Sequence, residues 1–248
     1  MHNLNEIKKT FYRDGFVKIK KLFNESEIKK IKKDIENIKK KFKRIRNPNM
    51  HYTSDKKFNT IHNINKFIKS GCIIQTSKDK RLINIVKKIL GGNVNLRNLE
   101  FFLKPKKTGK KAPVHQDNYY WNIPSKKALN IWIACSESNI KNGGLYYFVK
   151  SHKQGLIDHQ LSFQPGTSQE ISNQYLKKLN YKKFYPNLKP GDCVLHHCEV
   201  VHGSNKNNSN SDRIGLVMSF KSKKAKIDKK GWNVYQRKLK KNLLLLKK

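Results

Sequence analysis

The chain has 248 residues, of which 36% are hydrophobic and 10% aromatic. At this length that apolar content suffices for a core, so disorder of the whole chain is disfavoured. No apolar run approaches the roughly 20 residues that a bilayer span needs, and the first residues lack the apolar segment of a secretory signal. The four cysteines form no CxxC pair, which disfavours a zinc ribbon or a disulfide framework and indicates a cytoplasmic protein.

The formal net charge is +38, from 55 Lys and Arg against 17 Asp and Glu. Such a charge suggests an acidic partner, for example a nucleic acid. However, the cations are almost all scattered lysines, and only seven are Arg, the residue that binds phosphates through two parallel hydrogen bonds. Drift toward Lys, Asn and Ile codons therefore competes with a functional attraction of anions, and both interpretations stay open.

Residues 1–92 are predicted to form a support region of helices and a short strand. Asn24 can cap a helix, and Glu27, three residues later, completes the pattern of a capping box. Behind this pattern, apolar residues recur at helical spacing along a Lys-rich segment: Ile28, Ile31, Ile35, Ile38 and Phe42. A second helix is expected over residues 79–90, where a Gly-Gly pair ends it.

After residue 92 the apolar pattern alternates with a period of two, which is typical of β-strands. Residues 93–221 are therefore predicted to form a barrel or a double-sheet jelly roll. The expected strands cover residues 94–104, 114–121, 129–136, 145–149, 193–197 and 214–221. Residues 155–188 have little periodicity, and either a lid or a disordered insertion fits them. Residues 222–248 form a basic tail, in which a helix is expected from Trp232 onward.

One imidazole and one carboxylate, those of His115 and Asp117, stand two residues apart. In an extended chain such residues face the same side, so both can reach one metal ion. The pair alone is a weak signal, because His197 and Glu199 form a second pair of this kind. For His197 and its neighbour His196, ordinary packing or a surface position is the simpler interpretation.

The first pair gains weight from His202, which follows Asp117 by 85 residues and comes after a strand-like segment. Two histidines and one carboxylate form the facial triad of non-haem Fe(II) oxygenases, which leaves coordination positions open. Arg213 follows His202 by 11 residues, behind a loop rich in Asn and Ser. Large apolar residues alternate after it, so its guanidinium is expected on the opposite face of a strand, where an interior position would require an anion such as a carboxylate.

With these motifs the chain resembles the phytanoyl-CoA dioxygenase family of Fe(II)- and 2-oxoglutarate-dependent oxygenases. The similar segments contain, in order, His-x-Asp, Asn-Gly-Gly, Ser-His-Lys, Pro-Gly-Asp, His-Gly-Ser and a following Arg, and they cover residues 12–28, 114–121, 128–155 and 188–220. The resemblance implies a mainly β fold with flanking helices, namely a double-stranded β-helix (jelly-roll or cupin-like) barrel in one oxygenase domain. Most of the 155–188 insertion matches nothing in the family, so no substrate residue follows from it.

The resemblance also implies that His115, Asp117 and His202 bind Fe(II). Arg213 would bind the distal carboxylate of the co-substrate 2-oxoglutarate, and Ser204 would donate a hydroxyl group beside it. Ascorbate is a candidate reductant.

A further position in the family pattern is Trp132, which lines the co-substrate pocket. Its alternative role, as a core tryptophan of a barrel strand, fits the sequence equally well.

The implied reaction is hydroxylation of an unactivated C–H bond of a small-molecule or acyl substrate, with release of succinate and CO2. Asp117 argues against halogenation, because its carboxylate takes the coordination site that a halide would need. An anionic substrate would suit the positive charge. Two alternatives remain: a basic module that binds nucleic acid or other anions and has a vestigial metal site, and a cupin-like metalloenzyme without 2-oxoglutarate, in which Arg213 has no assigned purpose.

Overall fold

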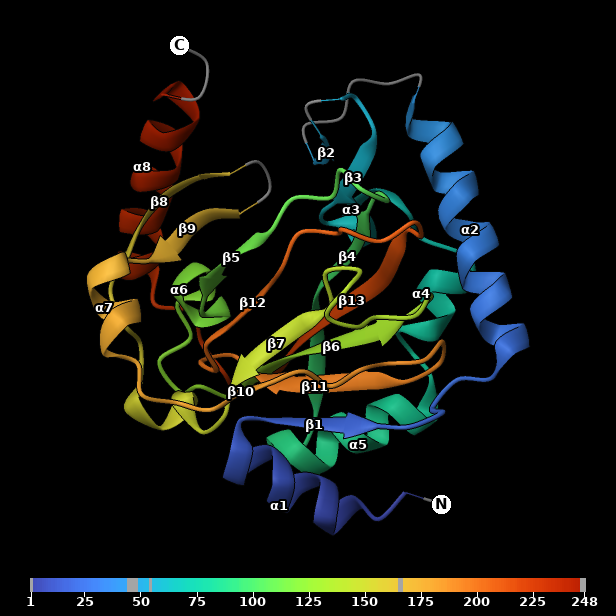
Figure 1. Cartoon of the computed structure of the whole chain (residues 1–248). Helices are drawn as coiled ribbons and strands as arrows, with labels where there is room; N and C mark the ends of the chain where they lie inside the picture. Colours follow the sequence, from blue (N-terminus) through green and yellow to red (C-terminus); the bar gives the residue numbers. More distant parts are fainter. Residues whose placement is uncertain (1, 44–48, 54, 165–166, 246–248) are drawn as a thin grey trace.

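Two antiparallel sheets face each other in the computed structural model, which describes residues 2–43, 49–53, 55–164 and 167–245 (Figure 1). The larger sheet has, in spatial order, β1 (Phe16–Ile19), β11 (Cys193–His197), β6 (Ala128–Ala134), β13 (Arg213–Ser222), β4 (Val94–Lys104), β3 (Phe58–Ile61) and β2 (Met50–Tyr52). The smaller sheet has β10 (Lys183–Phe184), β7 (Leu145–Phe148), β12 (His202–Ser204) and β5 (Ala112–His115). Because one sheet lies over the other, side chains on the facing surfaces meet in a barrel interior.

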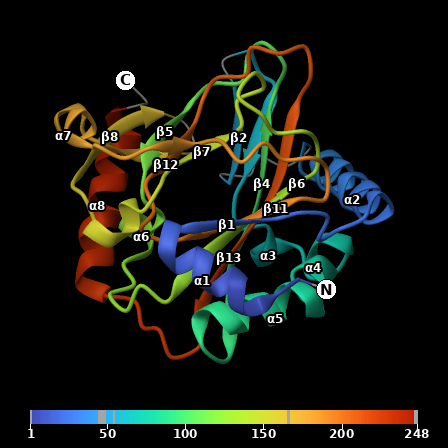
Figure 2. The ribbon, with the colours of Figure 1, turned by 60° about the horizontal axis from the view of Figure 1, so that its bottom comes forward.

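Helices cover the outer face of the larger sheet, as Figure 2 shows. They are α1 (Leu4–Asp14), α2 (Glu25–Lys43), α3 (Ile64–Phe67), α4 (Cys72–Thr76) and α5 (Lys80–Leu90). Their buried residues form one apolar cluster with alternate residues of the central strands, which include Leu99, Phe101, Ile131, Ile133, Leu195, Leu216 and Met218. This cluster fixes which residues of each strand turn toward the helices, and it leaves the alternating ones for the barrel interior.

The two helices expected in the N-terminal region are confirmed. The backbone N–H of Asn24 donates to Glu27 Oε2 at 2.7 Å, and the backbone N–H of Glu27 donates to Asn24 Oδ1 at 2.9 Å, which is a complete capping box. All five apolar residues of the predicted α2 stripe are buried. Helix α5 ends at Gly91, whose φ of 74° is left-handed. The proposed boundaries at residues 92 and 221 stay a prediction.

The strand predicted over residues 114–121 is wrong in its second half. Strand β5 ends at His115, Gln116 is extended, and Asp117 begins the short helix α6 (Asp117–Trp121). The side chain of Asn118 closes this turn, because its Oδ1 accepts a hydrogen bond from Ile123 N at 2.9 Å. The run of aromatic residues in this segment was compatible with a strand, but the local asparagine hydrogen bond favours a helical turn.

The described part of the 155–188 insertion is ordered into a hairpin of β8 (His159–Gln164) and β9 (Thr167–Ile171), the helix α7 (Asn173–Lys178) and β10. The expected basic tail contains α8 (Lys229–Leu245), which packs beside α6 (Figure 1). Lys238 Nζ donates to Tyr119 OH at 3.0 Å, and the rings of Tyr120 and Tyr235 meet edge to face at 5.6 Å. None of the described helices is long and apolar enough to cross a membrane.

His197 provides a pH test of the fold, because it is a buried histidine that points away from the barrel interior and packs against Phe11. Burial, followed by the nearby His152, lowers the pKa of His197 to about 3. The unfolded chain takes up this proton near pH 6.5, so the free energy of unfolding should fall as the pH drops from 6.5 toward 3, by up to about 1.4 kcal/mol per pH unit for this group. In His197→Gln, urea unfolding between pH 6.5 and 4 should show a shallower slope than in the wild type. Identical slopes would contradict the assignment.

Candidate metal centre and anion pocket

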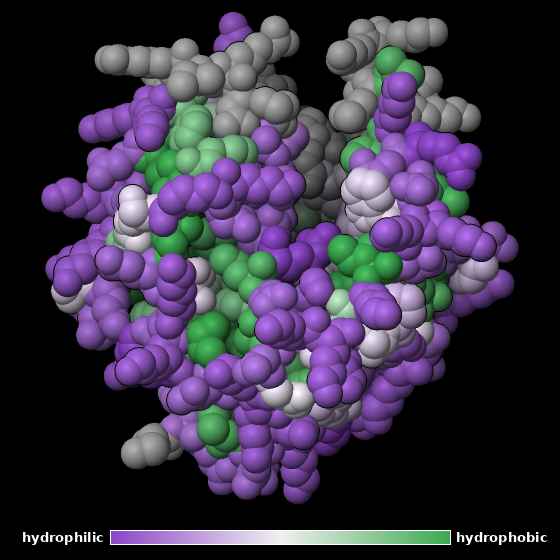
Figure 3. Space-filling view, turned by 180° about the vertical axis from the view of Figure 1, so that it is seen from behind, coloured by the Kyte–Doolittle hydropathy of each residue, from purple (hydrophilic) through white to green (hydrophobic). Residues whose placement is uncertain are grey.

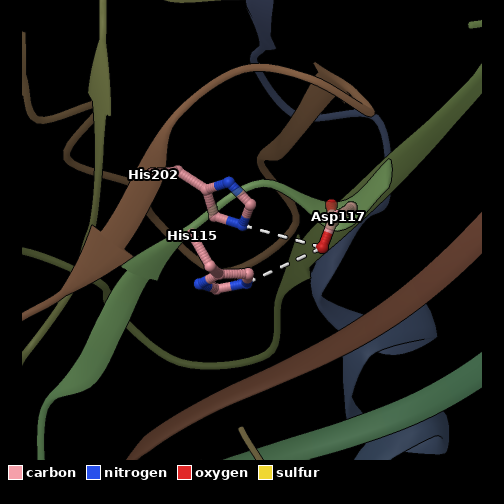
Figure 4. Close-up of side chains that lie close together, drawn as sticks. All are labelled: His115, Asp117 and His202. Atoms are coloured by element: carbon pink, nitrogen blue, oxygen red, sulfur yellow. Dashed lines mark ion pairs between the residues drawn. The ribbon is translucent and has the colours of Figure 1, made fainter. Parts of the chain in front are cut away.

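Three side chains from three elements bring nitrogen and oxygen atoms together inside the barrel (Figure 4). His115 ends β5, Asp117 begins α6 and His202 begins β12, and the pairing of β12 with β5 places the two histidines directly opposite each other. His115 Nε2 and His202 Nε2 lie 3.7 Å and 4.0 Å from Asp117 Oδ1. One ligand atom from each residue lies within 4.8 Å of the others. Donors about 2.1 Å from a common ion are roughly 3 Å apart, so a small closure suffices to hold one.

Both imidazoles are turned so that Nε2 faces the carboxylate. His115 Nδ1 donates to the carbonyl of Pro113 at 2.8 Å, and His202 Nδ1 donates to the carbonyl of Val200 at 3.0 Å. These bonds fix the tautomer and leave the lone pair of each Nε2 free. Burial is the main cause that lowers the pKa of each histidine to about 4. At neutral pH both side chains are therefore uncharged, the state in which histidine binds a metal.

The two oxygens of Asp117 have different surroundings. Oδ1 faces the two imidazoles, whereas Oδ2 accepts hydrogen bonds from Asn130 Nδ2 at 2.7 Å and from His196 Nε2 at 3.0 Å. Burial favours the neutral acid, but the proximity of His202 and the hydrogen bond from His196 outweigh it and lower the pKa of Asp117. The carboxylate of Asp117 is thus ionised. Its Oδ2 is held by two hydrogen bonds, whereas its Oδ1 is available to a metal ion.

A buried guanidinium lies on the interior face of β13. Arg213 is 3% exposed and lies over the Trp132 ring, with 5.3 Å between the guanidinium carbon and the ring centroid. Its Nε has no hydrogen-bond partner among the described residues. Burial lowers the pKa of Arg213 to about 10. As expected from the sequence, Arg213 shares its face with Gly215, which leaves the space that the Trp132 ring occupies.

A second buried cation lies opposite the first. The β13–β4 pairing places Lys104 directly across from Arg213, and Lys104 is 4% exposed. Lys104 Nζ donates to Ser204 Oγ at 2.7 Å, but no carboxylate of the described residues forms an ion pair with either cation. Burial and then the charge of Arg213 lower the pKa of Lys104 far below its usual value. A charged guanidinium beside a basic amine makes a receptor for an anion, because the unpaired buried charge of Arg213 is costly and an anion would also favour the protonated form of Lys104.

The metal-binding cluster and the anion pocket are parts of one interior. Ser204 follows His202 by two residues on β12, so both side chains leave the same face of that strand. The buried ring of Tyr147, on β7, stacks against His202 with centroids 5.8 Å apart. The charge of Arg213 acts on the same tyrosine. The interior could therefore hold a ligand whose metal-binding group lies at the histidines and whose carboxylate lies at Arg213.

Sequence reasoning found His115, Asp117, His202, Ser204, Trp132 and Arg213, and the structure places them all in this interior. Trp132 is at once a core residue and the surface on which Arg213 lies, so its two predicted roles are compatible. Sequence reasoning missed Lys104 and Asn130, and it assigned His196 an ordinary packing or surface role. Strand register alone could have found His196 and Asn130, since they stand directly opposite each other.

Solved structures of low sequence identity share this fold. EctD from S. alaskensis with bound Fe superposes with a TM-score of 0.76 over 90% of this chain and 78% of that chain, at 21% identity. The epimerase SnoN from nogalamycin biosynthesis, in complex with Fe3+, alpha ketoglutarate and nogalamycin RO, gives a TM-score of 0.71 over 90% and 84%, at 16% identity. The expected double-stranded β-helix is thereby confirmed.

Sequence comparison leads to the same class of protein. An ectoine dioxygenase of Bordetella parapertussis is 25% identical over 233 residues, which cover 86% of this chain and 73% of the relative. A probable alpha-ketoglutarate-dependent hypophosphite dioxygenase of Stutzerimonas stutzeri is 23% identical, over 87% and 77%. These relatives, the shared fold and the His-Asp-His cluster together identify a non-haem Fe(II)- and 2-oxoglutarate-dependent dioxygenase. Within this class, the family model described as phytanoyl-CoA dioxygenase matches residues 11–215, so the chain belongs to the phytanoyl-CoA dioxygenase family.

The contact between Gly215 and Trp132 gives a testable prediction about the pocket. A Cβ atom at position 215 would lie 2.1 Å from Cζ2 of the Trp132 ring, so Gly215→Ala must displace the tryptophan from beneath Arg213. We expect a loss of about 1–3 kcal/mol in the free energy of unfolding, measured by urea titration. Adding Trp132→Phe to Gly215→Ala should recover part of that loss. A single variant as stable as the wild type would contradict this packing.

Proposed function

We propose that this dioxygenase hydroxylates an unactivated C–H bond of a small-molecule or acyl substrate and releases succinate and CO2. In this proposal His115, Asp117 and His202 hold Fe(II), and Arg213, Ser204 and Trp132 form the site for the distal carboxylate of 2-oxoglutarate. The observation that carries it is the joint presence, in one barrel interior, of three converging ligand atoms and a buried guanidinium that has no acidic partner among the described residues.

The donor chemistry fits Fe(II). Two neutral imidazoles and one ionised carboxylate are the donor set of non-haem iron oxygenases, and they leave coordination positions open for further ligands. Bound iron supplies the activation of O2 that hydroxylation needs. The chain's own contribution is to keep Nε2 of both histidines unprotonated and to present a single oxygen of Asp117.

The co-substrate site fits a carboxylate. Arg213 offers a planar set of donors, of which Nε has no partner among the described residues, and Trp132 holds the guanidinium plane. The nearby Lys104 Nζ hydrogen-bonds to Ser204, and a bound carboxylate would favour its protonated form. Together these groups would hold one end of the dicarboxylate and direct its other end toward the histidines.

The class of substrate is proposed from the relatives together with the size of the domain. Proteins similar to this chain are named for ectoine, for hypophosphite and for phytanoyl-CoA, which are small or acyl compounds of unlike chemistry. Figure 3 shows hydrophilic residues spread over most of one face, with apolar patches between them. An anionic substrate is therefore supported only by the overall charge of +38, and nucleic-acid binding stays an alternative that nothing here favours.

The metal assignment predicts the behaviour of His115→Ala. Removal of one of three ligands should abolish succinate release from 2-oxoglutarate in the presence of Fe(II) and O2, because the remaining two side chains bind the ion weakly. Succinate would be measured by chromatography, with circular dichroism as the control for folding. Succinate release at the wild-type rate in a folded His115→Ala would refute the triad.

The co-substrate assignment predicts the behaviour of Arg213→Ala. Loss of a charge-assisted pair in a buried site costs about 2–5 kcal/mol, so the apparent affinity for 2-oxoglutarate should fall by about 30-fold or more. Arg213→Lys keeps the charge but loses the planar pair of donors, so it should lie between Ala and wild type. The measurement is anaerobic calorimetric titration of the Fe(II)-loaded protein with 2-oxoglutarate. Equal affinities for all three proteins would remove Arg213 from the site.

A further inference from the structure

A third imidazole adjoins the metal-binding cluster without being one of its ligands. His196 lies on β11, is 3% exposed, and its Nε2 is 3.0 Å from Asp117 Oδ2. The cluster of converging ligand atoms contains only His115, Asp117 and His202 among the described residues. His196 therefore contacts Asp117 Oδ2, the oxygen that does not face His115 and His202, and its ring also packs against the His202 ring with centroids 4.6 Å apart.

The other ring nitrogen of His196 determines the direction of the hydrogen bonds. Tyr147 OH lies 3.0 Å from His196 Nδ1. The phenol of Tyr147 is fully buried and can donate its proton to Nδ1. With Nδ1 as acceptor, the ring carries a proton on Nε2 and donates it to Asp117 Oδ2. The result is a directed chain from Tyr147 through His196 to the carboxylate.

The strands that carry this chain hold it in place. His196 stands directly opposite Asn130 in the β11–β6 pairing, so the two donors reach Asp117 Oδ2 from adjacent strands. Asn130 is itself fixed, because its Oδ1 accepts a hydrogen bond from Ser219 Oγ at 2.5 Å. Tyr147 comes from the smaller sheet, whereas His196, Asn130 and Ser219 come from the larger one. The hydrogen bonds that lead to Asp117 Oδ2 thus begin in both sheets of the barrel.

We propose that His196 is a positioning residue, which holds Asp117 Oδ2 so that the carboxylate meets the metal ion through Oδ1 alone. A carboxylate that binds through both oxygens would occupy one more coordination position, and the proposed reaction needs the open positions for 2-oxoglutarate and O2. The inference rests on the proposed function for the location of the ion. It adds that a residue which never touches the ion controls how the ion is bound.

The test measures metal binding directly, with Co(II) as the probe and the whole chain as the protein. In His196→Phe the ring remains but the donor is lost, and Co(II) affinity should fall about 10- to 100-fold, with an altered visible d–d spectrum. In His196→Gln an amide N–H can occupy the place of Nε2, so affinity and spectrum should return toward those of the wild type.

The matched control is the adjacent buried histidine. His197 is 7% exposed, lies on the opposite face of β11 and packs against Phe11, so His197→Phe disturbs the same strand without touching Asp117. It should bind Co(II) like the wild type. If His196→Phe binds Co(II) within twofold of the wild type, or if both Phe variants lose the same affinity, the proposal is overturned.

Two further variants keep the result decisive. Should His196→Phe not fold, Tyr147→Phe provides the test, because it removes only the hydroxyl that fixes the His196 ring. Its Co(II) affinity should still fall by about 10-fold, and wild-type affinity in this variant would overturn the proposal.

His115→Ala separates the proposed role of His196 from the proposed metal site. If it binds Co(II) as the wild type does, the metal assignment fails, whereas loss in His115→Ala with none in His196→Phe refutes only the role of His196.

Discussion

The carboxylate of Asp117 is the contact on which the arrangement of the site depends, because its two oxygens serve different walls of the barrel. Oδ1 faces the imidazoles that end β5 and begin β12 in the smaller sheet, and Oδ2 receives donors from β6 and β11 in the larger one. A buried carboxylate is stable only when its charge is met by hydrogen bonds or opposite charge. The contacts of Asp117 therefore help to fix the position of one sheet relative to the other.

The interior is polarised along its length. Neutral imidazoles and a carboxylate lie at one place, and two buried basic side chains without acidic partners in the described part of the chain lie at another, where Arg213 and Lys104 face each other across β13 and β4. In the low-dielectric interior, the Coulomb interaction between such groups acts over a longer range than on the surface. A dicarboxylate could place one end at a metal ion bound to the histidines and the other end at Arg213 and Lys104. The fold and the charges of the interior therefore agree with the class of enzyme that the family match indicates.

Most of the fold could be predicted from local patterns. The capping box at Asn24 and the period-two strands β4 and β11 are local signals, and they were placed to within a residue or two. The helix that begins at Asp117 was missed, because one hydrogen bond of Asn118 decided between two conformations that the aromatic pattern allowed equally. His196, Asn130 and Lys104 were missed for another reason. Their roles depend on which strand lies beside which, and in a chain with so many lysines a buried one has no distinctive signal.

The family match ends at residue 215, yet the helix that begins with Asp117 leans on a segment beyond it. Tyr119 and Tyr120 of α6 contact Lys238 and Tyr235 of α8, so the helix that begins with the proposed metal ligand Asp117 packs against a part of the chain outside the matched region. Evolution could consequently reshape the approach to this centre by altering the last helix, while the inherited chemistry of the barrel stays intact.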